Sequence, residues 1–115
     1  MSNTGLREQA FLVLTALAAE PQHGYAVIEN VLQMSEGRVH LHTGSLYAII
    51  DRLREMGLIE VDREEVVASR LRRYYRLTGA GVERLADEIR AMRRHADAAA
   101  ARLRRFRALQ DGGAA

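Results

Sequence analysis

The last third of the chain contains regularly spaced apolar residues. In a long helix, this spacing would place all of them on the same side of the helix. Steps of three and four residues alternate along it, which gives the 3.5-residue repeat of helices that pair with one another. Residues 79–115 are therefore predicted to form a C-terminal dimerisation helix of about 40 Å with a disordered end. This seam consists of Val82, Leu85, Ile89, Met92, Ala96, Ala99, Leu103 and Phe106.

A second copy of the chain is the expected partner of the seam, because the helices predicted ahead of it are too small to cover its length. The alternative is an amphipathic helix that lies on its own domain. If two tails run antiparallel, one register pairs every seam residue with a partner of fitting size. The pairs are Val82 with Phe106, Leu85 with Leu103, Ile89 with Ala99, and Met92 with Ala96.

Ahead of the tail, the hydrophobic pattern predicts three short helices, at residues 4–19, 24–34 and 43–57. Apolar residues recur there at the spacing of one helix face. Pro21 ends the first helix, since the residue before a proline is pushed out of the helical region. Arg38–His42 alternates between apolar and polar residues, which predicts a short strand between the second and third helices.

After residue 57 the apolar residues alternate with polar ones, as in a half-buried strand. This pattern predicts an antiparallel hairpin of Leu58–Glu65 and Leu71–Leu77, with Tyr75 in the core. The intervening residues contain no strong turn former, so the position of the loop stays open. Thr78 is the expected cap of the last helix.

The basic charge of the chain is concentrated in this hairpin. All 17 basic residues are arginines, and the net charge is +2. Residues 1–65 hold five arginines and ten acids, whereas residues 66–81 hold four arginines and no acid. Arginine binds phosphate through a planar fork of donors, so the hairpin is predicted to contact a phosphate backbone. The alternative is an ordinary solvated surface.

Several classes of protein are excluded or disfavoured by what the sequence lacks. There is no cysteine, which removes disulfides and thiolate chemistry. No apolar stretch approaches the length of a membrane span, and no signal peptide is visible, so a cytoplasmic protein is expected. His40 and His42 are interpreted as surface residues rather than metal ligands. No catalytic arrangement is visible, so neither enzyme activity nor a metal or other cofactor is expected.

The order of these elements is that of a winged helix-turn-helix. The predicted fold class is mainly α with a small β-hairpin wing, followed by the long C-terminal helix. Residues 1–78 would form the DNA-binding domain and residues 79–115 the dimerisation helix. In this fold the third helix enters the major groove and the wing follows the DNA backbone.

Four stretches between His23 and Gly81 resemble the PadR family of bacterial transcriptional regulators. They are His23-Gly24-Tyr25, Gly44-Ser45-Leu46-Tyr47, residues 52–59 (RLREMGLI) and residues 73–81 (RYYRLTGAG). The single predicted C-terminal helix is similar to the short-tailed branch of that family. The resemblance implies a homodimeric repressor that binds a palindromic double-stranded DNA operator and is released by a small-molecule effector. Family members that hold flat aromatic compounds do so between tryptophans, and this chain has no tryptophan.

Nine residues are the predicted DNA contacts, and they come from the second helix, the third helix and the hairpin. Tyr25 could instead lie in the core, Tyr47 could fill the gap between two helices, and Arg52 could pair with Asp51 or Glu55. The alternative function is a protein-interaction module that binds no DNA, which the negative charge of residues 1–65 favours. The nine residues are Tyr25, Thr43, Ser45, Tyr47, Ala48, Arg52, Arg70, Arg72 and Arg73.

Overall fold

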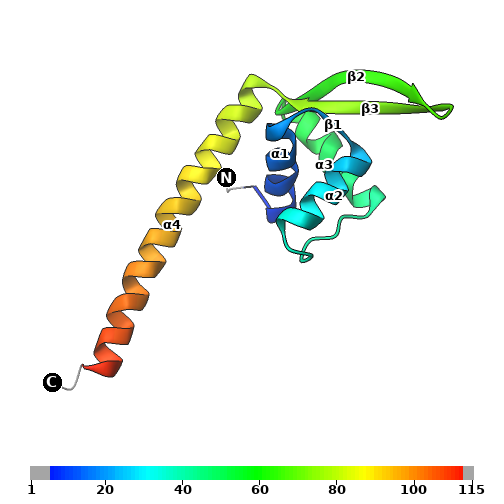
Figure 1. The fold of residues 1–115 in the computed structure, drawn as a ribbon. Coiled ribbons are helices and arrows are strands. Elements are labelled where there is room, and N and C mark those ends of the chain that lie inside the picture. Colours follow the sequence, from blue (N-terminus) through cyan, green and yellow to red (C-terminus); the bar gives the residue numbers. More distant parts are fainter. Residues whose placement is uncertain (1–5, 113–115) are drawn as a thin grey trace. The chain divides into compact units, whose positions relative to one another are not determined.

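A computed structural model describes residues 6–112 and contains four helices and three strands within them (Figure 1). The predicted winged helix-turn-helix and the long C-terminal helix are both confirmed. Among the described residues, no helix combines the length and the apolar content that crossing a membrane requires. The elements are α1 (Glu8–Ala19), β1 (Gln22–His23), α2 (Gly24–Met34), α3 (Thr43–Glu55), β2 (Ile59–Val67), β3 (Arg70–Leu77) and α4 (Gly79–Asp111).

The core lies where α1, α2 and α3 turn their apolar faces toward one another. Each helix contributes residues spaced three or four apart, which places them on one side of the helix. Leu58, Ile59 and Tyr75 join this core and seat the hairpin on the helices. The fully buried side chains include Val13, Leu14, Val27, Val31, Leu46 and Ile50.

Arg38–His42 does not form a strand, so that prediction is wrong. The alternation itself is real, because Val39 and Leu41 are buried while Arg38 and the two histidines are exposed. Alternating burial does not by itself supply a hydrogen-bonding partner for the backbone. The third strand of the sheet is instead β1, whose Gln22 and His23 pair with Tyr75 and Tyr74 of β3.

The β2–β3 hairpin, which we call the wing, extends beyond the helices (Figure 1). A two-residue turn closes it, and both residues of that turn, Ala68 and Ser69, have positive φ. Two positive φ angles are typical of the type I′ turn, whose twist matches that of the strands. Glycine or asparagine would have marked this turn in the sequence, and their absence explains why the loop could not be placed.

A β-bulge at Asp62 changes which residues of β2 share a face. Val61 lies opposite Tyr75 and Arg63 lies opposite Tyr74, so Asp62 is the extra residue. Beyond the bulge, Glu64 lies opposite Arg73. Directly opposite residues lie on the same face of a sheet, and faces alternate along each strand. Glu64 and Arg73 therefore share a face with the buried Tyr75.

Thr78 caps α4 as predicted. Its hydroxyl accepts a hydrogen bond from the Gly81 backbone N–H at 3.0 Å and donates one to the Gly57 carbonyl at 2.6 Å. The chain divides into two compact units after Leu85, within α4. Leu85 is buried inside the first unit, whereas Met92, Leu103 and Phe106 of the second unit are exposed.

Candidate nucleic-acid interface

The wing encloses an open groove with the start of α2 and with α3. Its volume is about 310 Å³. Five of the nine predicted DNA contacts line this groove, although they come from three separate parts of the chain. These five are Tyr25, Tyr47, Arg70, Arg72 and Arg73, and the other lining residues are His23, Gly24, Val67, Ala68 and Leu71.

Tyr47 fits both of the roles considered for it. Its ring packs against the backbone of Gly24, because a Cβ at Gly24 would lie only 2.7 Å from the Tyr47 Oη. The ring therefore fills the gap between α2 and α3. Tyr47 nevertheless stays 43% exposed, and it lines the groove.

Tyr25 does not belong to the core. It is 70% exposed, at the first turn of α2 and at the edge of the groove. The buried residues of α2 are instead Gly24, Val27 and Val31. The position leaves the phenol free to contact a ligand in the groove.

His23 was missed as a residue of this site, although it joins the wing to α2. Its Nδ1 accepts a hydrogen bond from the Ala26 N–H at 3.4 Å and so caps α2. Its ring lies edge-on to Tyr74, with 5.3 Å between the ring centroids. Partial burial, and to a smaller extent the charge of Arg72, lower the pKa of His23 below its usual value of 6.5. A histidine directly before a predicted helix start was the available signal for the cap.

The predicted contacts on α3 form a second surface. Ser45, Ala48 and Arg52 lie three and four residues apart and are exposed, so they share the outward side of the helix. Thr43 is exposed at the first position of the same helix. Within residues 6–112, Arg52 forms no ion pair, so the alternative of a pair with its own helix is not realised.

The arginines of the wing differ in how they are paired. Arg73 Nε lies 2.8 Å from Glu64 Oε2. Arg70 and Arg72 form no ion pair with any residue that the structure describes. The acid-free stretch of residues 66–81 does not reveal this difference, because the hairpin register brings the acids of β2 opposite β3.

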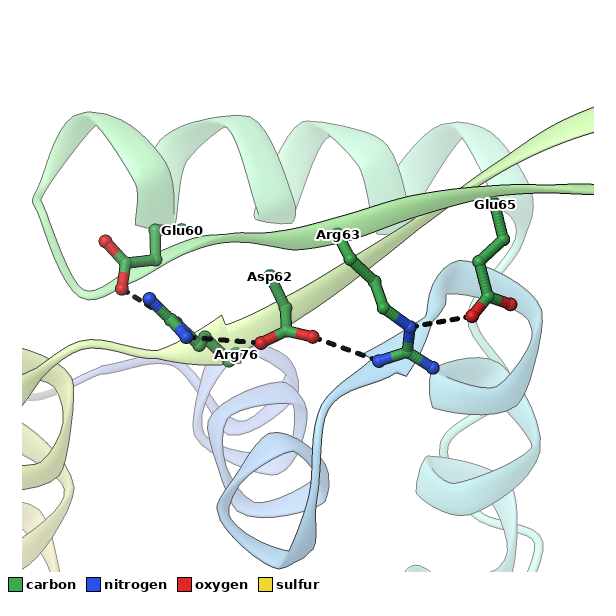
Figure 2. A network of polar contacts seen from close by, with 5 residues as sticks. All are labelled: Glu60, Asp62, Arg63, Glu65 and Arg76. Atoms are coloured by element: carbon green, nitrogen blue, oxygen red, sulfur yellow. Dashed lines mark hydrogen bonds and ion pairs between the residues drawn. The ribbon is translucent and has the colours of Figure 1, made fainter.

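A chain of ion pairs, the outer ladder, lies on the face of the wing opposite to Arg73 (Figure 2). Arg70 and Arg72 alternate with Arg73 along β3 and so share the face of the outer ladder, and the groove takes residues from both faces. Arg76 contacts Glu60 at 2.8 Å and Asp62 at 3.2 Å, while Arg63 contacts Asp62 at 3.0 Å and Glu65 at 2.8 Å. The carboxylates raise the pKa of Arg63 and Arg76, and Arg63 lowers the pKa of Glu65. Exposed pairs add little stability, but they fix where these charges point.

Arg63 also stacks on an aromatic ring of the wing. Its guanidinium carbon lies 3.9 Å from the centre of the Tyr74 ring. The Tyr74 ring also contacts the ring of His23 in β1. The outer ladder is therefore connected through Tyr74 to the cap of α2.

Comparison with known proteins identifies the family of this chain. The model of the transcriptional regulator PadR-like family matches residues 13–87, well over half of the chain. The chain belongs to the PadR-like family. Its members are transcriptional regulators, not enzymes. No curated protein matches the sequence.

Solved PadR-like structures share the fold. A PadR family regulator from Clostridium difficile R20291 has a TM-score of 0.69 at 22% identity and covers 84% of this chain and 99% of its own. A regulator from Eggerthella lenta has a TM-score of 0.66 at 25% identity, with 83% of each chain covered. Bacillus subtilis PadR, solved with operator DNA, has a TM-score of 0.65 at 19% identity, over 72% of this chain and 47% of its own.

Proposed function

We propose that the chain is a repressor that binds a palindromic DNA operator as a homodimer. The groove is the observation that carries this proposal. It gathers Tyr25, Tyr47, Arg70 and Arg72 from three segments onto one surface. Arginine side chains and tyrosine hydroxyls are the groups that proteins use to hold DNA phosphates. The solved complex of Bacillus subtilis PadR with operator DNA supports the choice of partner.

Base recognition is assigned to the outward side of α3. Thr43, Ser45 and Ala48 have short side chains, so the helix can approach the floor of the major groove closely. Arg52 lies one turn beyond Ala48 and supplies the cation that pairs with guanine or with a phosphate. Phosphate contacts in the groove would set the position of the protein, and these α3 residues would select the sequence.

The homodimer is assigned to the seam of α4. Leu103 and Phe106 are 46% and 57% exposed, which is unusual for two large apolar side chains three residues apart. The helix is also polarised, since residues 98–110 contain four arginines and no acid. An antiparallel second copy would bring these arginines near its Glu83, Asp87 and Glu88. Leu85 contributes less to the dimer seam than the sequence pattern suggested, because it is already buried within its own unit.

Release by a small-molecule effector would act through the dimer. A compound that binds one arrangement of the two winged domains better than another shifts the population toward that arrangement. Operator affinity falls when the favoured arrangement separates the two α3 helices by a distance that does not match the half-sites. The chain lacks the tryptophans that hold flat aromatic effectors in relatives.

Salt dependence separates this function from its alternative, a protein-interaction module. We expect the chain to bind mixed-sequence duplex DNA, and its affinity to fall steeply and linearly on a log–log plot as salt rises. Operator fragments selected from a random pool should bind more tightly and protect two related half-sites in a footprint. An absence of binding to any duplex, or binding that is insensitive to salt, would contradict the proposal.

A further inference from the structure

One arginine that lines the groove is paired with an acid of the wing. Arg73 lines the groove, and it shares a face of the hairpin with the buried Tyr75. Its cross-strand partner is Glu64, and the two side chains form a hydrogen-bonded ion pair at 2.8 Å. Both side chains are nearly half exposed, at 43% and 44%.

Glu64 is the one acid of β2 on this face. The register places Ile59, Val61 and Val66 on the same face, and all three are apolar. The remaining acids of β2, Glu60, Asp62 and Glu65, take part in the outer ladder on the opposite face. The bulge at Asp62 reverses the alternation beyond it, and this places Glu64 rather than Glu65 on the face of Tyr75. The pair of Glu64 with Arg73 is therefore separate from the outer ladder.

We propose that Glu64 attenuates sequence-independent DNA binding by holding Arg73 away from the phosphate backbone. This inference rests on the proposed function, because it assigns a role to the acid that is paired with an arginine of the DNA-binding groove. A phosphate that approaches Arg73 has to compete with a carboxylate already in contact. A carboxylate that stays in place also repels a phosphate bound to the same guanidinium, because both groups are negative and lie close together.

Arg72 differs from Arg73 in this respect. The acid opposite Arg72 is Glu65, and Arg63 already binds that carboxylate at 2.8 Å. Arg70 lies opposite Val67, which carries no charge. Arg70 and Arg72 are therefore available to phosphates, whereas Arg73 is already paired with Glu64. The sequence predicts the same phosphate contact for all three arginines, but we assign this contact to Arg70 and Arg72 and not to Arg73.

The test is a variant that removes the negative charge and keeps the shape, Glu64→Gln. We expect it to bind mixed-sequence duplex DNA about two- to fivefold more tightly at low salt, the range that one exposed ion pair spans. The log–log salt slope should become steeper by up to about 0.9 for each Arg73 that gains a phosphate. Binding is measured by fluorescence anisotropy over a series of salt concentrations. Thermal unfolding should be nearly unchanged.

Glu60→Gln is the matched control. It changes the net charge by the same amount in the same strand, but its partner Arg76 keeps Asp62 at 3.2 Å and does not line the groove. Its effect on DNA affinity should be clearly smaller. Arg73→Gln completes a double-mutant cycle. It should change little in the natural chain and should abolish the gain in the Glu64→Gln chain.

Two results would overturn the inference while leaving the proposed function intact. One is Glu64→Gln binding no more tightly than Glu60→Gln. The other is Arg73→Gln weakening the natural chain as much as Arg72→Gln does, since Arg73 would then already contact DNA. Failure of the natural chain to bind any duplex would contradict the proposed function itself, and this inference with it.

Discussion

The carbonyl oxygen of Leu58 occupies the space that a side chain at Gly81 would need. The same oxygen accepts the Thr78 N–H at 3.0 Å where the hairpin passes into α4. Gly81 is buried, and its φ is not positive, so the requirement for glycine comes from contact and not from backbone conformation. The end of α3, the wing and the start of α4 meet at this one contact.

Gly81→Ala should destabilise the fold by about 1–3 kcal/mol, the cost of forcing extra atoms into a packed site. Urea unfolding measures this difference. Gly79→Ala is the control, because nothing lies within 4 Å of a Cβ there. Alanine at that helix position should be neutral or stabilising by up to about 1 kcal/mol. Equal stability of the two variants would refute the contact.

Gly24→Ala should displace Tyr47, because the added Cβ would lie 2.7 Å from Oη and 3.1 Å from Leu46 Cδ2. We expect lower stability and weaker DNA binding. Tyr47→Phe removes the nearest atom, so the double variant should be more stable than the two single effects predict when added. A double-mutant cycle of unfolding free energies measures this coupling. Strict additivity would show that the tyrosine hydroxyl does not press on Gly24.

The pKa of His23 is lowered in the fold, chiefly by burial. The unfolded chain therefore binds a proton more readily, and the contribution of His23 to stability is lost as pH falls below about 6.5. The loss levels off below the pKa of the folded state. His23→Asn keeps a capping side chain that does not titrate there. We expect urea unfolding of the natural chain to lose more stability than this variant between about pH 7.5 and about pH 5.5. Equal losses of stability in the natural chain and in the variant would contradict this role of His23.

Side-chain burial could be predicted from the sequence more readily than the pairing of strands. Periodicity placed α2 at its observed bounds and α3 within two residues, and it placed Tyr75 in the core. The same periodicity misled at Arg38–His42, where Val39 and Leu41 are buried without a neighbouring strand. Burial follows from hydrophobicity, whereas strand pairing depends on which backbone edge is left open.

The site was predictable in part for the same reason. The type and location of the wing arginines were visible, but their availability depends on the hairpin register. The bulge at Asp62 and the turn at Ala68-Ser69 set that register. Neither contains a glycine or asparagine that would have indicated its position in the sequence. The contact of Tyr47 with Gly24 likewise joins residues that are far apart in the chain, and only packing reveals it.

The α4 seam is tested by Leu103→Asp with Phe106→Asp. Both residues are exposed in the single chain, so the variant should fold and sediment as a monomer, whereas we expect the natural chain to sediment as a dimer. Operator binding should weaken because half-site affinities no longer combine. Ala98→Asp with Ala108→Asp adds the same charge off the seam and should remain dimeric. A dimeric seam variant would contradict the assignment.

Helix direction in the dimer is tested with single cysteines, since the chain has none of its own. Antiparallel pairing sets His95 near its counterpart and keeps the two copies of Arg102 apart. We therefore expect His95→Cys to form a disulfide-linked dimer readily and Arg102→Cys to do so poorly. Parallel helices would cross-link equally well, or equally poorly, at both positions.

The most direct test of the groove as a DNA-binding surface is the salt slope of Arg70→Gln with Arg72→Gln. The control is Arg7→Gln with Arg76→Gln, which removes the same charge from two residues that do not line the groove. We expect the groove variant to lose about 0.9 from the magnitude of the slope for each lost phosphate contact, counted over both copies, and the control to lose much less. Equal slopes for the two variants, or an unchanged slope for the groove variant, would contradict it.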